Sequence, residues 1–192
     1  MKSRNIPKTT SNHNLRQLAL VGVLAAVLCI LGPMVLPLPF SPIPLSLATL
    51  AIYFASYILG ARRGVICCGI YLLMGLAGIP VFSGFSGGIG KVLGPTGGYL
   101  IGYLFMALIC GLFVDKWSGK TFIHFIGFLL GTAVCYLFGT AWLSMQSGLT
   151  LGAALAVGVL PFLPGDLVKV IVGITIGKQV RKRLVHLQFE NG

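Results

Sequence analysis

Six long apolar runs follow one another along this chain, with short connections between them. They lie at roughly 17–36, 45–60, 64–80, 97–114, 121–143 and 152–177. A helix that crosses a membrane needs about 20 mostly apolar residues. Only 9% of the 192 residues are charged, against about 25% in a typical soluble domain. The sequence therefore predicts an all-α integral membrane protein with six transmembrane helices, and it leaves no room for a large soluble catalytic domain.

Positive charge is concentrated in the termini and in the connections between these runs. The formal net charge is +11, which in a soluble protein would suggest nucleic-acid binding. Here membrane topology explains the short basic clusters better, because Lys and Arg in short loops stay on the cytoplasmic side. Six spans put twelve of the fourteen basic residues on one side: Lys2, Arg4, Lys8, Arg16, Arg62, Arg63, Lys116, Lys120, Lys178, Arg181, Lys182 and Arg183. Both termini are therefore predicted to be cytoplasmic, and no nucleic-acid partner is expected.

We expect one membrane domain at residues 17–178, in the cell (plasma) membrane, with basic cytoplasmic tails at 1–16 and 179–192. Two connections on the outer side have an unusual composition. Residues 84–98 contain seven glycines, and the connection after the first span contains Pro33, Pro37, Pro39, Pro42 and Pro44. Irregular backbone at membrane depth is tolerated where it is buried in protein or lines a cavity. These connections are therefore predicted to be lids over an outward-facing site.

One acid and one base lie inside the last apolar run. Asp166 and Lys169 are three residues apart, so they share a face of a helix that begins near Pro164. An isolated charge in the middle of a membrane costs about 2.5–3.5 kcal/mol, so the two should pair with each other or meet a polar ligand. A purely structural ion pair and a ligand-binding pair both fit this pattern. In the second case Lys169 would anchor a carboxylate and Asp166 would accept ligand N–H groups.

Two enzyme motifs are incomplete in this chain. Gly84-Phe85-Ser86-Gly87 matches the string found in intramembrane serine proteases of the rhomboid type. A serine nucleophile needs a histidine within hydrogen-bond reach, whereas His124 begins the fifth run at its cytoplasmic end. A phosphate-binding loop ending at residues 119–121 would need glycine where Val114 stands. The chain is therefore not expected to be an enzyme, and the protease stays a remote alternative.

The five cysteines all lie within apolar runs and lack metal-site spacing, so neither a metal nor a cofactor is expected. Small residues on the first run raise a different possibility. Gly22 and Ala26 are four apart, with Ala25 and Cys29 offset by three. Such a face lets another helix approach closely, either inside the protein or from a partner.

Three segments occur in order along the chain: 78–84 (GIPVFSG), 94–99 (GPTGGY) and 163–169 (LPGDLVK). In this combination the chain resembles the BioY family, the biotin-binding substrate (S) components of energy-coupling factor (ECF) transporters. The resemblance implies six helices, both termini inside and an outward-facing biotin pocket. It also implies a transmembrane coupling (T) subunit and two cytoplasmic ATP-binding subunits as partners. The partner face would map onto Gly22, Ala25, Ala26 and Cys29.

The resemblance also suggests how a biotin pocket would be lined. Asp166 and Lys169 would meet the polar ends of the vitamin. Thr49 would supply a polar group near the position where many members carry glutamine and this chain has Ala48. The remaining expected site residues are two aromatic residues along the apolar middle, two lid residues and one pocket-wall tyrosine: Phe82, Tyr136, Ser86, Lys91 and Tyr99. An S component or small permease for a different vitamin is the alternative.

Overall fold

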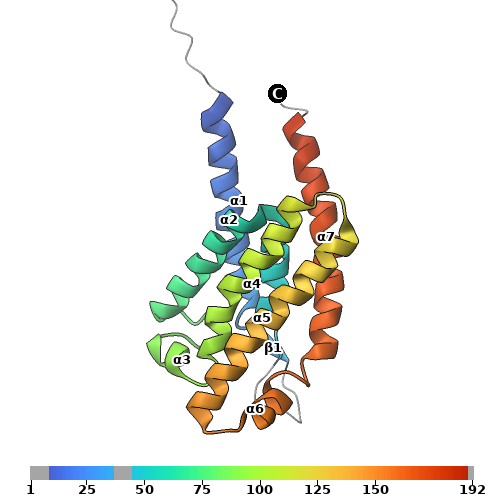
Figure 1. Ribbon diagram of the computed structural model, residues 1–192. Coiled ribbons are helices and arrows are strands. Elements are labelled where there is room, and N and C mark those ends of the chain that lie inside the picture. The colour runs from blue at the N-terminus through green and yellow to red at the C-terminus, as the bar shows by residue number, and fades with distance from the viewer. Residues whose placement is uncertain (1–8, 37–44, 190–192) are drawn as a thin grey trace, which may run out of the picture.

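The computed structural model describes residues 9–36 and 45–189. Within them the chain forms seven helices and two short antiparallel strands (Figure 1): α1 (Thr9–Leu31), β1 (Val35–Leu36), β2 (Leu45–Ser46), α2 (Ala48–Leu76), α3 (Ile89–Leu93), α4 (Gly97–Lys116), α5 (Thr121–Ser147), α6 (Leu151–Gly158) and α7 (Leu163–Phe189). The predicted proline-rich lid lies largely outside the described residues, at Pro37, Pro39, Pro42 and Pro44.

Several helices have the length and composition of membrane spans. Helices α2, α4 and α5 are each long and apolar enough to cross a membrane, and α6 with α7, bent by 53°, satisfy the same test together. Helix α1 contributes a shorter apolar helix at Leu15–Leu31. The predicted helical membrane protein is therefore confirmed. The sixth predicted run is divided into the short α6, which is capped at its start by Thr150, and α7, which begins after the bend.

Helix α2 reverses direction at Gly60, where the backbone leaves the helical region at φ 76° and ψ −171°. A Cβ atom placed on Gly64 would lie 3.3 Å from Ser56 Cα. In a continuous helix eight residues would separate these positions by about 12 Å. The second and third predicted runs are therefore two arms of a helical hairpin, a first arm at residues 48–59 and a second arm at 61–76 (Figure 1).

The turn between these arms is held by Asp115 from the end of α4. Asp115 Oδ2 accepts a hydrogen bond from Ala61 N–H at 2.8 Å, and a carboxylate at a helix N-terminus is stabilising. Arg181 of α7 lies 3.6 Å from the other carboxylate oxygen. One acid thus joins α2, α4 and α7 at this end of the bundle.

Small residues allow the central helices to pack closely. A Cβ atom on Gly102 of α4 would lie 3.0 Å from Cys135 Cα of α5, and one on Gly173 of α7 would lie 2.8 Å from Tyr53 Cβ of α2. The Tyr53 ring also packs on Phe128 of α5, with ring centroids 5.3 Å apart. Because these contacts involve backbone and Cβ positions, larger residues at the two glycines would separate the helices.

Helix α1 has one packed face and one exposed face. Gly22 and Ala26 are exposed, and nothing lies within 4 Å of a Cβ atom placed on Gly22. Cys29 is half-buried. Val21 and Ala25 are buried in a cluster with residues of α2, namely Ala55, Leu59 and Cys67. Ala25 therefore packs inside the bundle, whereas Gly22 and Ala26 lie on the exposed face of α1.

The two ends of the molecule differ in the elements they carry. Figure 1 shows α3, α6 and β1 gathered at one end, and the beginning of α1 and the end of α7 at the other. The bend between α6 and α7 lies at the first end, and it brings the first turn of α7 into the bundle beside α2 and α5. The first turn of α7 carries Asp166.

Candidate ligand-binding site

Asp166 and Lys169 form an ion pair near the start of α7. Lys169 Nζ lies 2.9 Å from Asp166 Oδ1, and each side chain is 7% exposed. The three-residue spacing places both groups on one helix face. A buried pair keeps its favourable energy only when further hydrogen bonds satisfy the remaining lone pairs and protons. The stability of this pair, and its capacity to bind a ligand, therefore depend on the polar groups around it.

Groups from β2, α2 and α5 complete the surroundings of the pair. Lys169 Nζ donates to the carbonyl oxygen of Ser46 at 2.6 Å and to Thr49 Oγ1 at 3.1 Å. Tyr136 Oη donates to Asp166 Oδ2 at 2.5 Å. Three helices that are far apart in sequence thus converge on one charge pair, and each carboxylate oxygen has at least one donor.

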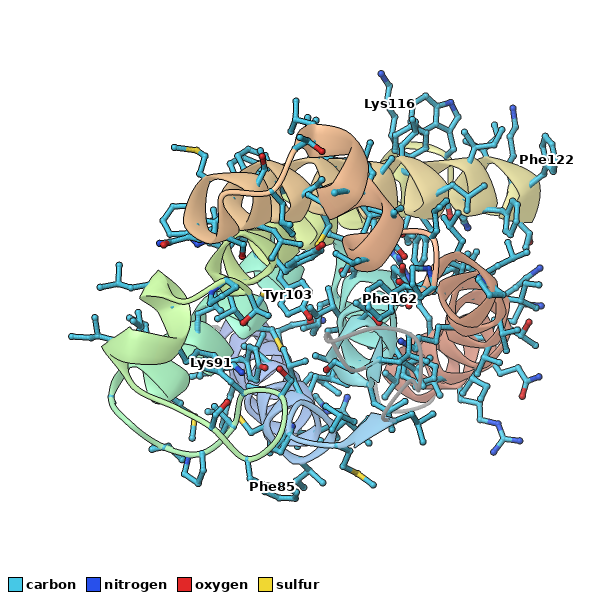
Figure 2. All side chains as sticks on the ribbon, turned by 90° about the horizontal axis from the view of Figure 1, so that it is seen from below. Phe85, Lys91, Tyr103, Lys116, Phe122 and Phe162 are labelled. Carbon is cyan, nitrogen blue, oxygen red and sulfur yellow. The ribbon has the colours of Figure 1, made fainter. Side chains whose placement is uncertain are left out.

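A cavity of about 60 Å³ opens beside this pair. Figure 2 views the molecule from the end that carries α3 and α6; Tyr103 and Phe162 lie near the centre of this view, whereas Phe85, Lys116 and Phe122 lie at its edge. The cavity is mostly apolar apart from the ion pair and a few hydroxyl groups. Its lining comes from β2, α2, α4, α5 and α7, from the loop after α2, and from the connections that precede α4 and α7: Leu45, Ser46, Thr49, Ser83, Thr96, Tyr99, Leu100, Tyr103, Met106, Thr132, Cys135, Tyr136, Phe162, Asp166 and Lys169.

Five of the eight residues expected at the site line this cavity: Thr49, Tyr99, Tyr136, Asp166 and Lys169. Tyr99 Oη donates to the carbonyl oxygen of Gly158 at 2.8 Å, so it also ties α4 to α6. Because Tyr99 and Tyr136 are engaged through their hydroxyl groups, their rings are held at the cavity wall. An interfacial anchor would instead expose its ring to the membrane surface.

Phe82 and Ser86 lie beside the cavity without lining it. Phe82 is fully buried and packs edge-on against Tyr71, with ring centroids 5.4 Å apart. Ser86 pairs with Phe82 through backbone hydrogen bonds, and its Oγ donates to the carbonyl oxygen of Ser83 at 2.8 Å. Both residues shape the loop that presents Ser83 to the cavity.

Lys91 also does not line the cavity. It lies on α3, which is fastened to α5 by two hydrogen bonds: Gln146 Nε2 donates to the carbonyl oxygen of Leu93 at 2.7 Å, and Trp142 Nε1 donates to that of Gly94 at 2.9 Å. The glycine-rich connection is thus anchored at one side of the cavity. A direct role for Lys91 would require this segment to move.

Several lining residues were missed by the sequence analysis, including Tyr103, Met106 and Thr132. They lie on helices that are apolar on nearly all sides, so composition does not reveal which face meets the cavity. Helical spacing would have identified these residues once Tyr99 and Tyr136 were assigned to the cavity wall. Tyr103 and Met106 follow Tyr99 by four and seven residues, and Thr132 precedes Tyr136 by four.

The geometry argues against the rhomboid-type protease. Of the three histidines, His124 is the one whose side chain the structure describes. Both nitrogens of its ring have a hydrogen-bond partner. Its Nδ1 lies 3.0 Å from Tyr57 Oη and its Nε2 lies 2.9 Å from the carbonyl oxygen of Trp117. His124 begins α5 at the end opposite the loop that carries Ser86 (Figure 1). The described side chains therefore contain no serine–histidine pair at this site.

Comparison with known proteins identifies the family. A family model described as the BioY family matches residues 4–186. This chain belongs to the BioY family. Its relatives include the biotin transporter BioY of Lactococcus lactis subsp. cremoris (strain MG1363), which is 34% identical over 183 residues, covering 91% of this chain and 95% of the relative. The biotin transporter BioY of Thermotoga maritima is 31% identical over 168 residues, covering 88% and 97%.

A solved structure resembles this member of the BioY family over nearly its full length. It is the S-component for biotin from an ECF-type ABC transporter. The TM-score is 0.85 at 35% sequence identity, and the match covers 91% of this chain and 95% of the solved chain. At this identity and coverage the two chains share their helical architecture, including the bundle that surrounds the cavity.

Proposed function

We propose that this chain binds biotin and serves as the substrate-capture subunit of an ATP-driven ECF transporter in the cell membrane. Its similarity to proteins named as biotin transporters and to a biotin S-component supports this function. The observation that carries the proposal is the buried ion pair of Asp166 and Lys169 at the wall of the cavity. Intramembrane ionisable residues that face a cavity are typical of substrate sites.

The chemistry of the cavity matches that of biotin. The vitamin has a carboxylate at one end, a ureido ring with N–H donors at the other and an apolar middle. Asp166 accepts the ureido hydrogen bonds, while Lys169 either attracts the carboxylate or orients Asp166. Tyr99, Tyr136 and Thr49 complete the wall. The cavity of about 60 Å³ holds only a few water molecules, so the vitamin enters when lining side chains and lid segments move apart.

The topology that we propose has six membrane crossings, made by α1, the two arms of α2, α4, α5 and α7. Residues 17–178 form one membrane domain, and both tails are cytoplasmic. This arrangement is supported by the basic residues at the turn of α2 and between α4 and α5, namely Arg62, Arg63, Lys116 and Lys120. These connections lie at the end of the bundle opposite α3 and α6 (Figure 1), which supports a cavity that faces outward.

The partners that we propose are a T subunit and two ATP-binding subunits, which supply the energy for transport. The exposed face of α1 around Gly22 and Ala26 is the proposed contact with the T subunit. Its support is the open space at Gly22, since small residues let a partner helix approach closely.

Replacing Gly22 with leucine should block copurification with the T subunit while biotin binding is retained. The added side chain would fill the space that the partner helix needs, and its Cβ atom would have no described atom of this chain within 4 Å. Gly69→Leu is the matched control, because Gly69 also lies in a helix and has nothing within 4 Å of its Cβ position. Retained assembly of Gly22→Leu, or equal loss in Gly69→Leu, would contradict this interface.

A ligand screen tests the proposed function directly. Full-length protein purified in detergent is titrated with biotin, thiamine and riboflavin by isothermal calorimetry, and thermal shift is followed in parallel. We expect binding and stabilisation by biotin alone. Binding of another vitamin in its place would support the alternative S component, and absence of binding by folded protein would reject the biotin assignment.

A further inference from the structure

A second groove lies at the end of the bundle opposite the cavity. It has a volume of about 630 Å³ and runs between the beginning of α1, the turn of α2 and the later part of α7. Figure 1 shows that α1 and α7 extend past the turn of α2 at this end. The groove therefore has two helical walls and a floor at the turn, and its volume is in the range of small-molecule sites.

The floor and one wall of the groove carry arginines. Arg62 and Arg63 come from the turn of α2, and Arg181 comes from α7. One acid, Asp115, also lines the groove, so three arginines face one carboxylate and leave a charge of +2. Asp115 is already engaged by Arg181 at 3.6 Å and by the N–H of Ala61.

The other acid among the described residues cannot neutralise this charge. The chain contains three acidic residues in all: Asp166 is bound to Lys169 at the other end, Asp115 is paired as described, and Glu190 lies outside the described residues. Among the residues that the structure describes, Arg62 and Arg63 form no ion pair. Within the described part of the chain these arginines therefore lack a matching anion, which a bound ligand would supply.

The walls of the groove point to a particular source of that anion. Leu18 of α1 is 68% exposed and Ile66 of α2 is 48% exposed, and both line the groove together with further aliphatic side chains. Aliphatic walls beside arginines at the end of membrane-spanning helices suit a molecule with a phosphate and an attached acyl chain. Basic pockets between transmembrane helices bind anionic lipid headgroups in this way.

We propose that this groove binds the headgroup of an anionic glycerophospholipid, with Arg62 and Arg63 contacting the phosphate and the aliphatic walls contacting the start of the acyl chains. Arginine suits this role because its planar guanidinium binds phosphate oxygens in pairs. The site lies at the end opposite the proposed biotin cavity, so the lipid assignment does not depend on the ligand of that cavity.

Native mass spectrometry of the full chain tests this assignment. Protein in a neutral detergent is titrated with dioleoylphosphatidylglycerol or dioleoylphosphatidylcholine, and bound lipid is counted. We expect at least fivefold more retained phosphatidylglycerol than phosphatidylcholine. The Arg62→Gln/Arg63→Gln variant should retain at least fivefold less phosphatidylglycerol than the unmodified chain. The Arg62→Lys/Arg63→Lys variant should keep most of the retention, because the positive charge remains. If the double glutamine variant does not fold, Arg62→Gln alone is measured and should show a smaller loss.

The matched control is Lys116→Gln/Lys120→Gln, which removes two positive charges from the same end outside the groove. It should retain phosphatidylglycerol within twofold of the unmodified chain. Equal retention of both lipids, unchanged retention in the arginine variants, or equal loss in the lysine control would overturn the proposal. Displacement of the lipid by millimolar glycerol 3-phosphate would assign the groove to a free anion. Loss of T-subunit copurification in the arginine variants with unchanged lipid retention would assign it to a protein partner.

Discussion

Replacing Lys169 with methionine should lower the affinity for biotin at least tenfold. The substitution removes the cation that lies 2.9 Å from Asp166 Oδ1 and leaves that carboxylate buried without its charge partner. Breaking a buried pair in this way costs about 3–5 kcal/mol, and about 1.4 kcal/mol corresponds to one decade of affinity. Asp166→Asn should have an effect of similar size. Titration calorimetry on purified, folded protein measures both.

A double variant separates binding from structure. Asp166→Asn/Lys169→Met has no buried charge, so its melting temperature should recover toward that of the unmodified chain while biotin affinity stays low. If the pair were only structural, affinity would recover together with stability. Lys178→Met is the control for loss of a lysine from α7, because Lys178 bonds to Thr121 Oγ1 at 2.7 Å, away from the cavity. It should bind biotin normally.

Replacing Gly60 with alanine should lower the melting temperature by several degrees. Gly60 has φ 76° and ψ −171°, a backbone conformation that is essentially restricted to glycine and costs other residues about 1–3 kcal/mol. A Cβ atom at this position would also clash with the carboxylate of Asp115, which holds the turn of α2. A loss of about 2 kcal/mol corresponds to about 4–8 °C in a chain of this size. Thermal unfolding in detergent, followed by circular dichroism, measures the change.

Gly69→Ala is the control for this prediction. Gly69 lies in the second arm of the same helix, and nothing lies within 4 Å of its Cβ position. Alanine is favoured over glycine inside a helix by about 0.5–1 kcal/mol, so this variant should be as stable as the unmodified chain or slightly more so. Equal melting temperatures for Gly60→Ala and Gly69→Ala would show that the turn does not require glycine.

The helical membrane class was predictable from local composition, but helix boundaries were predicted less well. The fourth predicted run, 97–114, agrees closely with α4 at Gly97–Lys116. The sixth predicted run covers two helices, because the bend before α7 lies inside an apolar stretch that contains Pro161. The reversal at Gly60 lies at the end of the second predicted run, 45–60. The carboxylate of Asp115, which holds this turn, is 54 residues away in sequence.

For the site, the sequence alone identified the acid and the base, since a charged side chain inside an apolar run is conspicuous and costly whatever the fold. The choice of their neighbours depended on tertiary structure. Thr49 and Tyr136 reach the pair because α2 and α5 pack beside α7. Phe82, an equally plausible aromatic residue in sequence, instead packs on Tyr71 in the core.

This division has a physical reason. The cost of placing a charge in lipid depends on the residue type and on its position along the chain, so it can be estimated from the sequence alone. Which face of a uniformly apolar helix meets a cavity depends on how closely its neighbours approach. In this protein that approach is set by glycines such as Gly102 and Gly173, whose contacts are made with helices distant in the sequence.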